Sequence, residues 1–365
     1  MFGAAVADRL AGDGLDVTLV ERAEPGHAGA ESGGESRLMR FSHGPDALYT
    51  RSAWRSCELW GELEEELGEE LIARCGVAWF ARREGGWEAE AEAAMRAQGI
   101  PVERLSPADG AALYPSLHTG DLAFVLLEPE AGVLRAAAAT RALGERARRR
   151  GARVVRGEAR PDGAAVVVDG ERLEADVLVW ACGAWLATLF PEVVELRVTQ
   201  QDVVFFEAGP EWDAGRVPAY ADYDGAGYGL GRLDGHGMKV AMDFDGPPVD
   251  PGRRPETAAP ESERAAREYL DMRFPALAGA PLDRAKVCHY SATGDMSFLA
   301  GPHPALDGVW IVGGGSGHGF KHGPAVAEHV AEAIAGRVQP EPRYAIAPRA
   351  GGRSLRTAGW SGGDA

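Results

Sequence analysis

The sequence predicts an α/β fold made of two interleaved domains, one built on a parallel sheet and the other on a mostly antiparallel sheet. A helix followed by a strand near the start of the chain, and a strand, turn and helix near its end, favour the parallel sheet. In the second half of the chain, residues 196–207, 227–233 and 238–244 have the pattern of antiparallel strands. The two sheets therefore draw on alternating parts of the chain.

The chain is organised around residues 309–324. Val309–Val312 is an apolar run that predicts a strand, and a glycine-rich turn follows it before a segment with apolar residues at helical spacing. The glycines of this turn include Gly315, Gly317 and Gly319. Such a turn lets backbone N–H groups approach a ligand closely, and a helix N-terminus favours negative charge. A tight connection without a ligand is the alternative, but Lys321 adds a cation and favours a binding site.

Residues 1–22 have the pattern of the second half of a dinucleotide-binding βαβ unit, as in a Rossmann-like domain. Gly3 stands where the third glycine of the Gly-x-Gly-x-x-Gly motif would fall, and Glu21 stands where an acidic residue would bind the ribose hydroxyls. The first strand and the first two glycines are missing, so we expect the natural protein to begin upstream of Met1. A plain helix–strand pair is the alternative.

Composition excludes several classes of protein. The 365 residues, 45% of them hydrophobic, are enough for two packed domains. With a net charge of −17, the chain is a poor partner for nucleic acids and anionic membranes. It has no apolar run long enough to span a bilayer and no signal-peptide pattern, and its four cysteines are far apart. We therefore expect a cytoplasmic protein without nucleic-acid or membrane partners.

The order of these segments predicts the domain boundaries. The parallel-sheet domain comprises residues 1–72, 132–195 and 285–340, and the antiparallel-sheet domain comprises residues 73–131 and 196–284. The tail at 341–365 has too little apolar content to pack, and we expect it to be mobile.

Four motifs then point to one family. They are Gly34–Arg40, Gly237–Val240, Val287–Tyr290 and Ser316–Lys321. With these motifs the sequence resembles the FAD-dependent amine oxidases of the monomeric sarcosine oxidase and N-methyltryptophan oxidase family, from Gly3 to about Arg337. The resemblance implies an FAD-binding Rossmann-like domain with its first strand missing, a small amine or amino-acid substrate, oxygen as a second substrate, and a monomer.

The resemblance also implies which residues contact FAD. Cys288 matches a cysteine that bonds covalently to the flavin ring at its 8α carbon, although a free cysteine is most often a small buried hydrophobe. The full set of expected FAD contacts is Gly3, Glu21, Arg22, Ser36, Gly183, Trp185, Cys288, Gly315, Gly317, His318, Gly319, Phe320 and Lys321.

The catalytic residues that the resemblance implies are Arg37, Tyr228, Lys239 and Asp243. Arg37 matches a residue packed against the reactive face of the flavin. Arg37 and Arg40 are three residues apart, so one helical turn could aim both the same way, and a solvated surface pair is the alternative. Lys239 matches the lysine that helps reduced flavin react with oxygen, where a fixed positive charge stabilises developing negative charge. An exposed strand lysine is the alternative for Lys239. Arg40 and Lys321 match the residues that hold the substrate carboxylate, which Arg can bind bidentately.

Asp243 departs from the family pattern, because the sarcosine oxidase type has an active-site histidine at this position. Histidine can be neutral near pH 7, whereas aspartate is normally ionised. A carboxylate that faces the substrate disfavours a simple N-methylglycine and favours a substrate with a cation or several hydroxyls. The identity of the substrate therefore stays open.

A metal ion is not expected. His318 and His322 are four residues apart, a spacing that could suggest a metal site. No nearby carboxylate completes a set of ligands, and the resemblance assigns this segment to a turn that faces the flavin.

These features predict a flavoenzyme that oxidises the C–N bond of a secondary or primary amino acid. Hydride equivalents pass to flavin N5, water hydrolyses the imine to an aldehyde or keto product, and oxygen reoxidises the flavin to give hydrogen peroxide. Two alternatives stay open. One is a dehydrogenase with the same site and another electron acceptor, and the other is a flavin-free, inactive homologue, for which the missing first strand is the motive.

Overall fold

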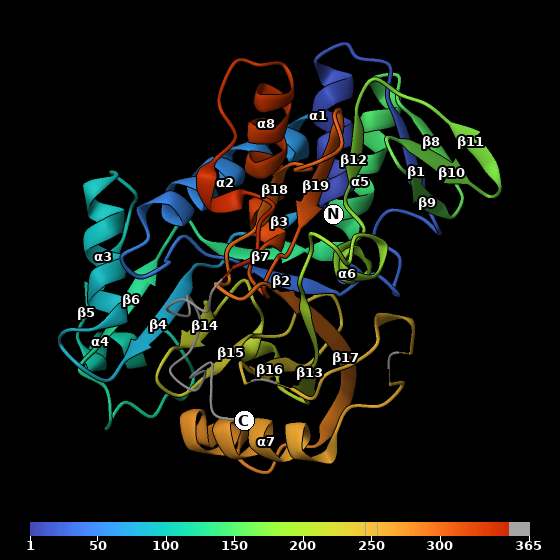
Figure 1. Cartoon of the computed structure of the whole chain (residues 1–365). Coiled ribbons are helices and arrows are strands. Elements are labelled where there is room, and N and C mark those ends of the chain that lie inside the picture. The colour runs from blue at the N-terminus through green and yellow to red at the C-terminus, as the bar shows by residue number, and fades with distance from the viewer. Residues whose placement is uncertain (245, 254, 350–365) are drawn as a thin grey trace.

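The computed structural model describes residues 1–244, 246–253 and 255–349. Figure 1 shows two stacked regions, with helices and short strands above and a broad twisted sheet over a single helix below. The fold is a mixed α/β arrangement, which confirms the predicted fold class. Within the described ranges, no helix is both long enough and apolar enough to cross a lipid bilayer.

The parallel strands of the upper region form two separate sheets. In one, β1 (Thr18–Glu21) pairs with β8 (Arg153–Arg156). In the other, β12 (Leu178–Trp180) pairs in parallel with β19 (Val309–Gly313), and β18 (Leu299–Pro302) adds an antiparallel strand. The carboxyl ends of β1, β12 and β19 point toward the middle of the molecule (Figure 1). In parallel sheets of this kind, ligands bind at the carboxyl ends of the strands.

Four helices surround these strands. They are α1 (Phe2–Gly12), α2 (Ala47–Leu67), α5 (Ala136–Arg149) and α8 (Gly323–Ile334). α1 packs against both α5 and α8, and α2 packs against α8. Because α8 follows β19 through the glycine-rich turn, the strand, turn and helix predicted for residues 309–324 are confirmed.

The ends of α2 follow from local chemistry. The Asp46 carboxylate accepts hydrogen bonds from the backbone N–H groups of Leu48 and Tyr49, which would otherwise lack a partner within the helix. Gly68 ends the helix in the left-handed conformation, with φ of 70°. The helix therefore starts and stops at residues suited to those positions.

The lower region is an eight-stranded sheet in the order β17-β13-β16-β15-β14-β4-β6-β5. Its strands are β4 (Val77–Ala81), β5 (Glu103–Leu105), β6 (Phe124–Glu128), β13 (Arg197–Phe206), β14 (Ala219–Asp222), β15 (Gly227–Leu230), β16 (Met238–Met242) and β17 (Leu282–Ala292). Neighbouring strands are antiparallel except β14 and β4. Helix α7 (Pro260–Arg273) packs under this sheet (Figure 1). β17 extends beyond the domain boundary predicted at 285, and the remaining predicted boundaries stay a prediction.

A further small sheet lies between the two regions. It pairs β2 (Ser36–Met39) and β3 (Ile72–Ala73) with β7 (Gly132–Arg135). The remaining elements are α3 (Trp87–Ala97), α4 (Pro107–Ala111), α6 (Leu186–Leu189), and the strands β9 (Ala159–Asp162), β10 (Ala165–Val168) and β11 (Glu171–Leu173). The latter three form their own antiparallel sheet.

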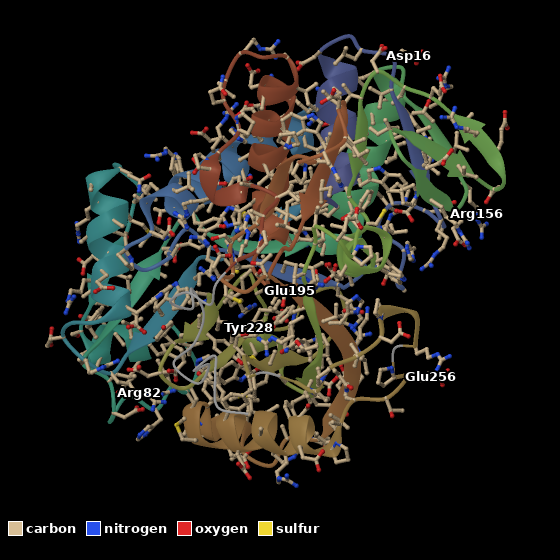
Figure 2. All side chains as sticks on the ribbon, viewed as in Figure 1. Asp16, Arg82, Arg156, Glu195, Tyr228 and Glu256 are labelled. Carbon is tan, nitrogen blue, oxygen red and sulfur yellow. The ribbon has the colours of Figure 1, made fainter. Side chains whose placement is uncertain are left out.

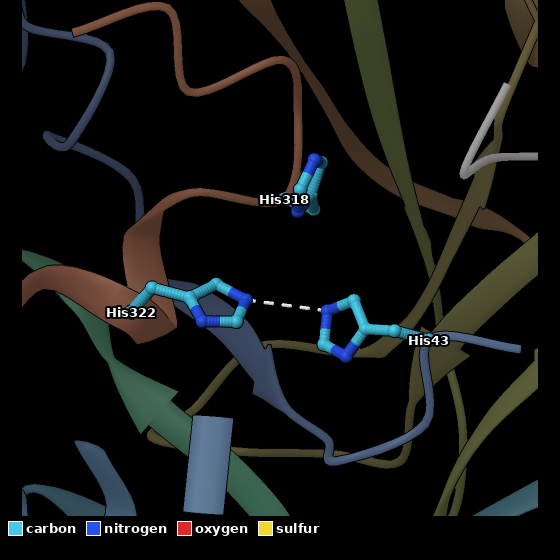
Figure 3. A group of neighbouring side chains, drawn as sticks. All are labelled: His43, His318 and His322. Atoms are coloured by element: carbon cyan, nitrogen blue, oxygen red, sulfur yellow. Dashed lines mark hydrogen bonds between the residues drawn. The ribbon is translucent and has the colours of Figure 1, made fainter. Parts of the chain in front are cut away.

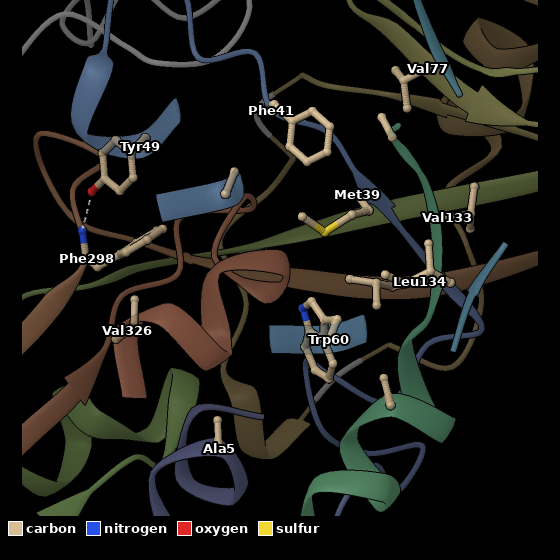
Figure 4. Packing of buried hydrophobic residues seen from close by; sticks show 14 of the residues in the cluster. Ala5, Met39, Phe41, Tyr49, Trp60, Val77, Val133, Leu134, Phe298 and Val326 are labelled. Carbon is tan, nitrogen blue, oxygen red and sulfur yellow. Dashed lines mark hydrogen bonds between the residues drawn. The ribbon is translucent and has the colours of Figure 1, made fainter. Parts of the chain in front are cut away.

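The main apolar core joins the two regions. Figure 4 shows Met39, Phe41, Trp60, Leu134 and Val326, which come together from four segments of the chain. Every one of these side chains is 1% exposed or less. Because the core takes β2, α2, β7 and α8 together, the glycine-rich turn before α8 is held at a fixed position above the lower sheet.

The tail differs in part from the prediction. Residues 341–349 are described and pack on the body of the protein: Tyr344 and Ile346 are buried, and Arg343 pairs with Asp46 at 2.6 Å. Arg349 also pairs with Asp295 at 3.1 Å, so two buried side chains and two ion pairs hold this short segment. The rest of the predicted mobile tail, residues 350–365, lies outside the described residues.

A buried ion pair joins α1 to α5. Arg146 donates to both carboxylate oxygens of Asp8, with N–O distances of 3.0 and 2.7 Å. The side chains are 8% and 4% exposed. On the outer surface, Asp16 and Arg153 form a looser pair at 3.5 Å and are 78% and 66% exposed.

We expect Asp8→Ala to lower the free energy of unfolding by about 3 kcal/mol, because the buried Arg146 guanidinium would keep only the more exposed Glu66 carboxylate, at 3.3 Å, as a partner. The exposed Asp16→Ala should change it by less than about 1 kcal/mol. Urea unfolding of the two variants and the wild type, at equal m-values, measures both effects. Equal losses in the two variants would show that the buried pair does not hold α1 on α5.

Candidate active site

A cavity open to solvent lies where the lower sheet meets the glycine-rich turn, and its empty space, together with the open solvent at its mouth, is about 1000 Å³. Most of the expected functional residues line it: Arg37, Arg40, Tyr228, Lys239, Asp243, Cys288, Gly317, His318, Phe320 and Lys321. Figure 2 places Tyr228 in the lower sheet, close to the level at which the two regions meet. The fold therefore gathers at one place residues that are far apart in the sequence.

The upper wall of the cavity is the turn between β19 and α8. Ser316 has φ of 48° and its hydroxyl donates to the carbonyl of Gly314 at 2.9 Å, which stabilises a left-handed conformation that is rare outside glycine. A Cβ atom on Gly319 would lie 2.7 Å from the Cα of Gly315, so the turn folds back closely on itself. This close approach explains why glycine is needed at 319 and leaves the backbone accessible to a ligand.

Lys239 extends from β16 and is 5% exposed. Its Nζ donates to the hydroxyl of Ser36 at 3.2 Å and to the Ser36 carbonyl at 3.4 Å. Burial, with a smaller effect of the nearby Arg37, lowers the pKa of Lys239 to about 8. The ammonium is therefore still mostly charged at neutral pH, and both of its neutral partners leave that charge in place.

Arg37 lies on β2, where the sequence predicted that one helical turn would aim Arg37 and Arg40 the same way. The structure has a strand instead, because this segment pairs with β7. Arg37 donates to the carbonyl of Glu31 at 2.6 Å and to that of Ser36 at 2.8 Å. Its guanidinium carbon lies 5.9 Å from the centre of the Phe320 ring, next to the glycine-rich turn.

Arg40, which is half-buried, and Lys321, which is buried, form a pair of cations in the cavity wall. Lys321 is 3% exposed, and its Nζ donates to the carbonyl of His318 at 3.0 Å. Arg40 donates to the carbonyl of Ser42. Burial lowers the pKa of Arg40 to about 10 and that of Lys321 well below its ordinary value. An anion in the cavity would relieve the cost of both buried charges.

Glu128 is the carboxylate that balances part of this charge, and the sequence reasoning missed it. It is fully buried at the end of β6 and accepts hydrogen bonds from the Trp79 indole at 2.7 Å, the Phe41 backbone and the Ser42 hydroxyl. Its charge opposes the lowering of the pKa values of Arg40 and Lys321. A lone carboxylate that ends the apolar run 124–128 was the available signal.

Two tyrosines meet on the lower wall. The hydroxyls of Tyr228 on β15 and Tyr290 on β17 are 2.8 Å apart. Burial raises the pKa of Tyr290 well above its ordinary value. Cys288 lies two residues before Tyr290, so the half-buried thiol is on the same face of β17. Tyr290 stood within a predicted motif but was not assigned to the site.

An aromatic wall completes the cavity, and it was also missed. It consists of Trp79, Trp87 and Tyr223. The Trp79 and Trp87 ring centres are 4.5 Å apart, and Trp87 stacks on Tyr223 at 4.9 Å. These residues come from β4, the start of α3 and the loop after β14, and nothing in their local sequence distinguishes them from core aromatics.

Three buried histidines lie beside the part of the cavity that Arg40 and Lys321 line, which we call its carboxylate end. His318 and His322 were singled out from the sequence, and the fold adds His43. Burial, and then the positive charge of Lys321, lowers the pKa of all three well below 6.5. The rings are therefore neutral at pH 7.

The remaining expected FAD contacts lie away from this cavity, at the ends of β1 and β12. Glu21 ends β1, and the guanidinium of Arg22 lies 4.7 Å from the centre of the Trp185 ring. Gly183 follows β12 with φ of 55°, and Gly3 is in the first turn of α1, close to the end of the same strand. The structure thus gathers the expected residues in two groups. One lines the cavity, and the other lies at the carboxyl ends of β1 and β12.

Comparison with known proteins identifies the family. A family model described as FAD dependent oxidoreductase matches residues 1–333. The chain belongs to this family of FAD-dependent oxidoreductases. The resemblance drawn from the four motifs is therefore confirmed, together with the FAD cofactor.

Several relatives of this FAD-dependent oxidoreductase are enzymes of known activity. Monomeric sarcosine oxidase from Bacillus sp. (strain B-0618) is 29% identical over 359 residues, which cover 93% of this chain and 91% of the relative. N-methyl-L-tryptophan oxidase from Yersinia pestis (strain Pestoides F) is 26% identical over 86% of this chain and 87% of the relative. The crystal structure of L-proline dehydrogenase from P. horikoshii has the same fold, with a TM-score of 0.83, 21% identity, and coverage of 94% and 93%.

The residues present fit FAD. The glycine-rich turn has left-handed residues and no side chain at Gly315 or Gly319, where a Cβ would close the gap between them. The cavity below the turn has buried cations, Lys239 and Lys321, and is roomy enough for a ring system with a substrate beside it. Both features suit a flat cofactor that is held against the turn and gains negative charge when it is reduced.

Proposed function

We propose that this FAD-dependent oxidoreductase oxidises the C–N bond of a secondary or primary amino acid, with N-alkyl amino acids of the sarcosine type as the substrate class. The observation that carries the proposal is the pair of buried cations, Arg40 and Lys321, on the wall of one cavity. FAD, when bound, would supply the two-electron acceptor for oxidation of the amine to an imine, which water would hydrolyse, and oxygen would be reduced to hydrogen peroxide. The relatives named sarcosine oxidase and N-methyl-L-tryptophan oxidase support this assignment.

Arg40 and Lys321 would bind and orient the substrate carboxylate. A carboxylate offers them the counter-charge that Glu128 supplies only in part, and two charge-assisted donors fix its direction. Arg37 and the Tyr228–Tyr290 pair line the same cavity, so they would face the amine and α-carbon of a substrate held by its carboxylate. Positioning of this kind is most of what the protein adds to a flavin reaction.

Asp243, which also lines the cavity, bears on the identity of the substrate. Asp243 lines the cavity just after β16, and its backbone N–H is fixed by the Ala226 carbonyl at 2.7 Å. A second carboxylate in the cavity disfavours N-methylglycine itself, because its small apolar groups offer nothing to an ionised oxygen. The aromatic wall of Trp79, Trp87 and Tyr223 adds room for a larger side chain. We therefore favour an amino acid whose side chain carries a cation or hydroxyls.

The other FAD contacts, the monomeric state and action in the cytoplasm belong to the same proposal. Glu21, Arg22, Gly183 and Trp185 would hold the nucleotide end of FAD, and Ser36, Gly317, His318 and Phe320 would hold the flavin end. The relatives named monomeric sarcosine oxidase cover nearly the whole chain and support a monomer.

We expect Arg40→Ala and Lys321→Ala each to raise KM for an N-methyl amino acid by about 10- to 100-fold, the cost of one hydrogen bond to a charged group. An N-methylamine that lacks the carboxylate should be affected little. Steady-state kinetics on the two compounds, with flavin content confirmed, make the comparison. Arg83→Ala is the control, since Arg83 is 66% exposed and pairs with Asp224 on the surface. Equal losses on both compounds would show that neither cation binds the carboxylate.

Lys239→Met should slow reoxidation of the reduced enzyme by oxygen by about 100-fold or more, while reduction by substrate changes far less. The ammonium stabilises negative charge that develops on oxygen, and this charged form is lost as pH rises through about 8. Reoxidation in the wild type should therefore fall between pH 7 and pH 9, and in Lys239→Met it should be slow and independent of pH. Stopped-flow measurement of each half-reaction tests this.

The same experiment separates the oxidase from a dehydrogenase. Stoichiometric hydrogen peroxide is expected from the wild type. Slow reoxidation of the wild type, with rapid turnover on an artificial electron acceptor, would assign the site to a dehydrogenase, and Lys239 would then have another role.

We further propose that FAD is linked covalently through Cys288. The thiol is half-buried in the cavity, on the face of β17 that also presents Tyr290. Acid precipitation of the purified enzyme should leave the yellow colour in the pellet, and Cys288→Ser should release it to the supernatant. Cys182→Ser is the control, because burial raises the pKa of Cys182 to about 11 and it lies outside the cavity. Colour in the supernatant of the wild type would rule out the linkage.

A further inference from the structure

Behind the carboxylate end of the cavity, three histidines form one buried group (Figure 3). His43 follows β2, His318 lies in the glycine-rich turn, and His322 ends the short helix η5 (Phe320–His322). They are 1%, 6% and 0% exposed. Each offers a ring nitrogen, and these nitrogens all lie within 4.8 Å of one another. Segments far apart in the sequence thus present three imidazoles to the same point.

The second nitrogen of each ring is already held by another group. His43 Nδ1 is 2.9 Å from the Phe41 carbonyl, and His318 Nε2 is 3.0 Å from the Met296 carbonyl. His322 Nδ1 is 3.0 Å from the Ser52 hydroxyl. Hydrogen bonds of this kind fix the orientation of histidines that ligate metals and select the nitrogen that faces the ion. His318 Nδ1 has no hydrogen-bond partner among the described residues.

We propose that His43, His318 and His322 form a binding site for a divalent transition metal ion that prefers imidazole ligands, such as Zn²⁺. The Nε2 atoms of His43 and His322 are 3.2 Å apart. Two nitrogens bound to one tetrahedral zinc at about 2.0 Å lie roughly 3.3 Å apart, so this separation needs almost no change. The third ring must move by roughly 1.5 Å or less to complete three protein ligands, with the fourth position open.

A metal ion at this point needs negative charge nearby, because its surroundings are already positively charged. Arg40 and Lys321 oppose a third cation here, and the rings of Tyr49 and Phe298 pack against His318. Glu128 offsets one charge, and a hydroxide at the open fourth position would offset another. His318 also lines the cavity, which gives the ion and this hydroxide a way in.

This inference goes beyond the proposed amine oxidation and does not depend on it. A metal ion at this point would tie the segment after β2, which carries Arg40, to η5, which carries Lys321. The earlier expectation of no metal considered only His318 and His322, and the fold supplies the third ligand that these two lacked.

The test is binding of Co²⁺ to the flavin-loaded protein, with cobalt as a coloured probe for the zinc site. One Co²⁺ per chain is expected, with absorption at wavelengths longer than those of the flavin, and Zn²⁺ should abolish that absorption. His43→Phe should lose stoichiometric binding. Ser52→Ala, which removes a hydrogen bond to a ligand and no ligand itself, should weaken binding by about 10- to 100-fold. His118→Gln is the control, since its side chain is 49% exposed and lies outside the group.

No cobalt bound to the wild type, or equal binding to the wild type and His43→Phe, would overturn the proposal. Should His43→Phe lose its fold or its flavin, X-ray absorption of the zinc-loaded wild type decides instead. Three imidazole nitrogens around zinc are expected, and fewer than three would refute the site.

Discussion

The cavity depends on holding four positive charges in a mostly buried place without neutralising them. The hydrogen bonds of these side chains go to neutral oxygens: Arg37 to the carbonyl of Glu31, Arg40 to that of Ser42, Lys239 to Ser36, and Lys321 to the carbonyl of His318. Carbonyl partners satisfy the donors and compensate part of the desolvation cost, yet they add no negative charge. The site therefore keeps a surplus of positive charge for an anionic ligand.

Strand β2 is the element that makes this arrangement possible. The carbonyl of Ser36 accepts from both Arg37 and Lys239, so one backbone position links a cation on β2 to a cation on the lower sheet. β2 in turn is fixed by its pairing with β7 and by the burial of Met39 in the core. A shift of β2 by one residue would turn Arg37 away from the cavity, because neighbouring strand residues face opposite sides. The precision of the site thus rests on the register of this short strand.

The parts that the sequence could predict are those decided by neighbouring residues. The turn before α8 and Lys321 within it follow from a glycine run between a strand and a helix, and Cys288 and Lys239 follow from local motifs. Glu128, Trp79 and His43 could not be found in this way, because their roles depend on partners about 50 to nearly 280 residues distant. The strand at Arg37 was missed for the same reason, since pairing with β7 overrides any local helical preference.

Trp79 shows how the carboxylate end of the cavity is joined to the aromatic wall. Its indole N–H donates to Glu128 at 2.7 Å, its ring faces the Arg40 guanidinium at 5.2 Å, and its ring centre lies 4.5 Å from that of Trp87. One rigid side chain with a single donor thus sets the distance between the cation that would bind a carboxylate and the surface on which a side chain would pack. Because Trp79 is anchored on a buried carboxylate, the proposed function implies that a substrate would be selected by the span between its carboxylate and its side chain as well as by the charge at either end.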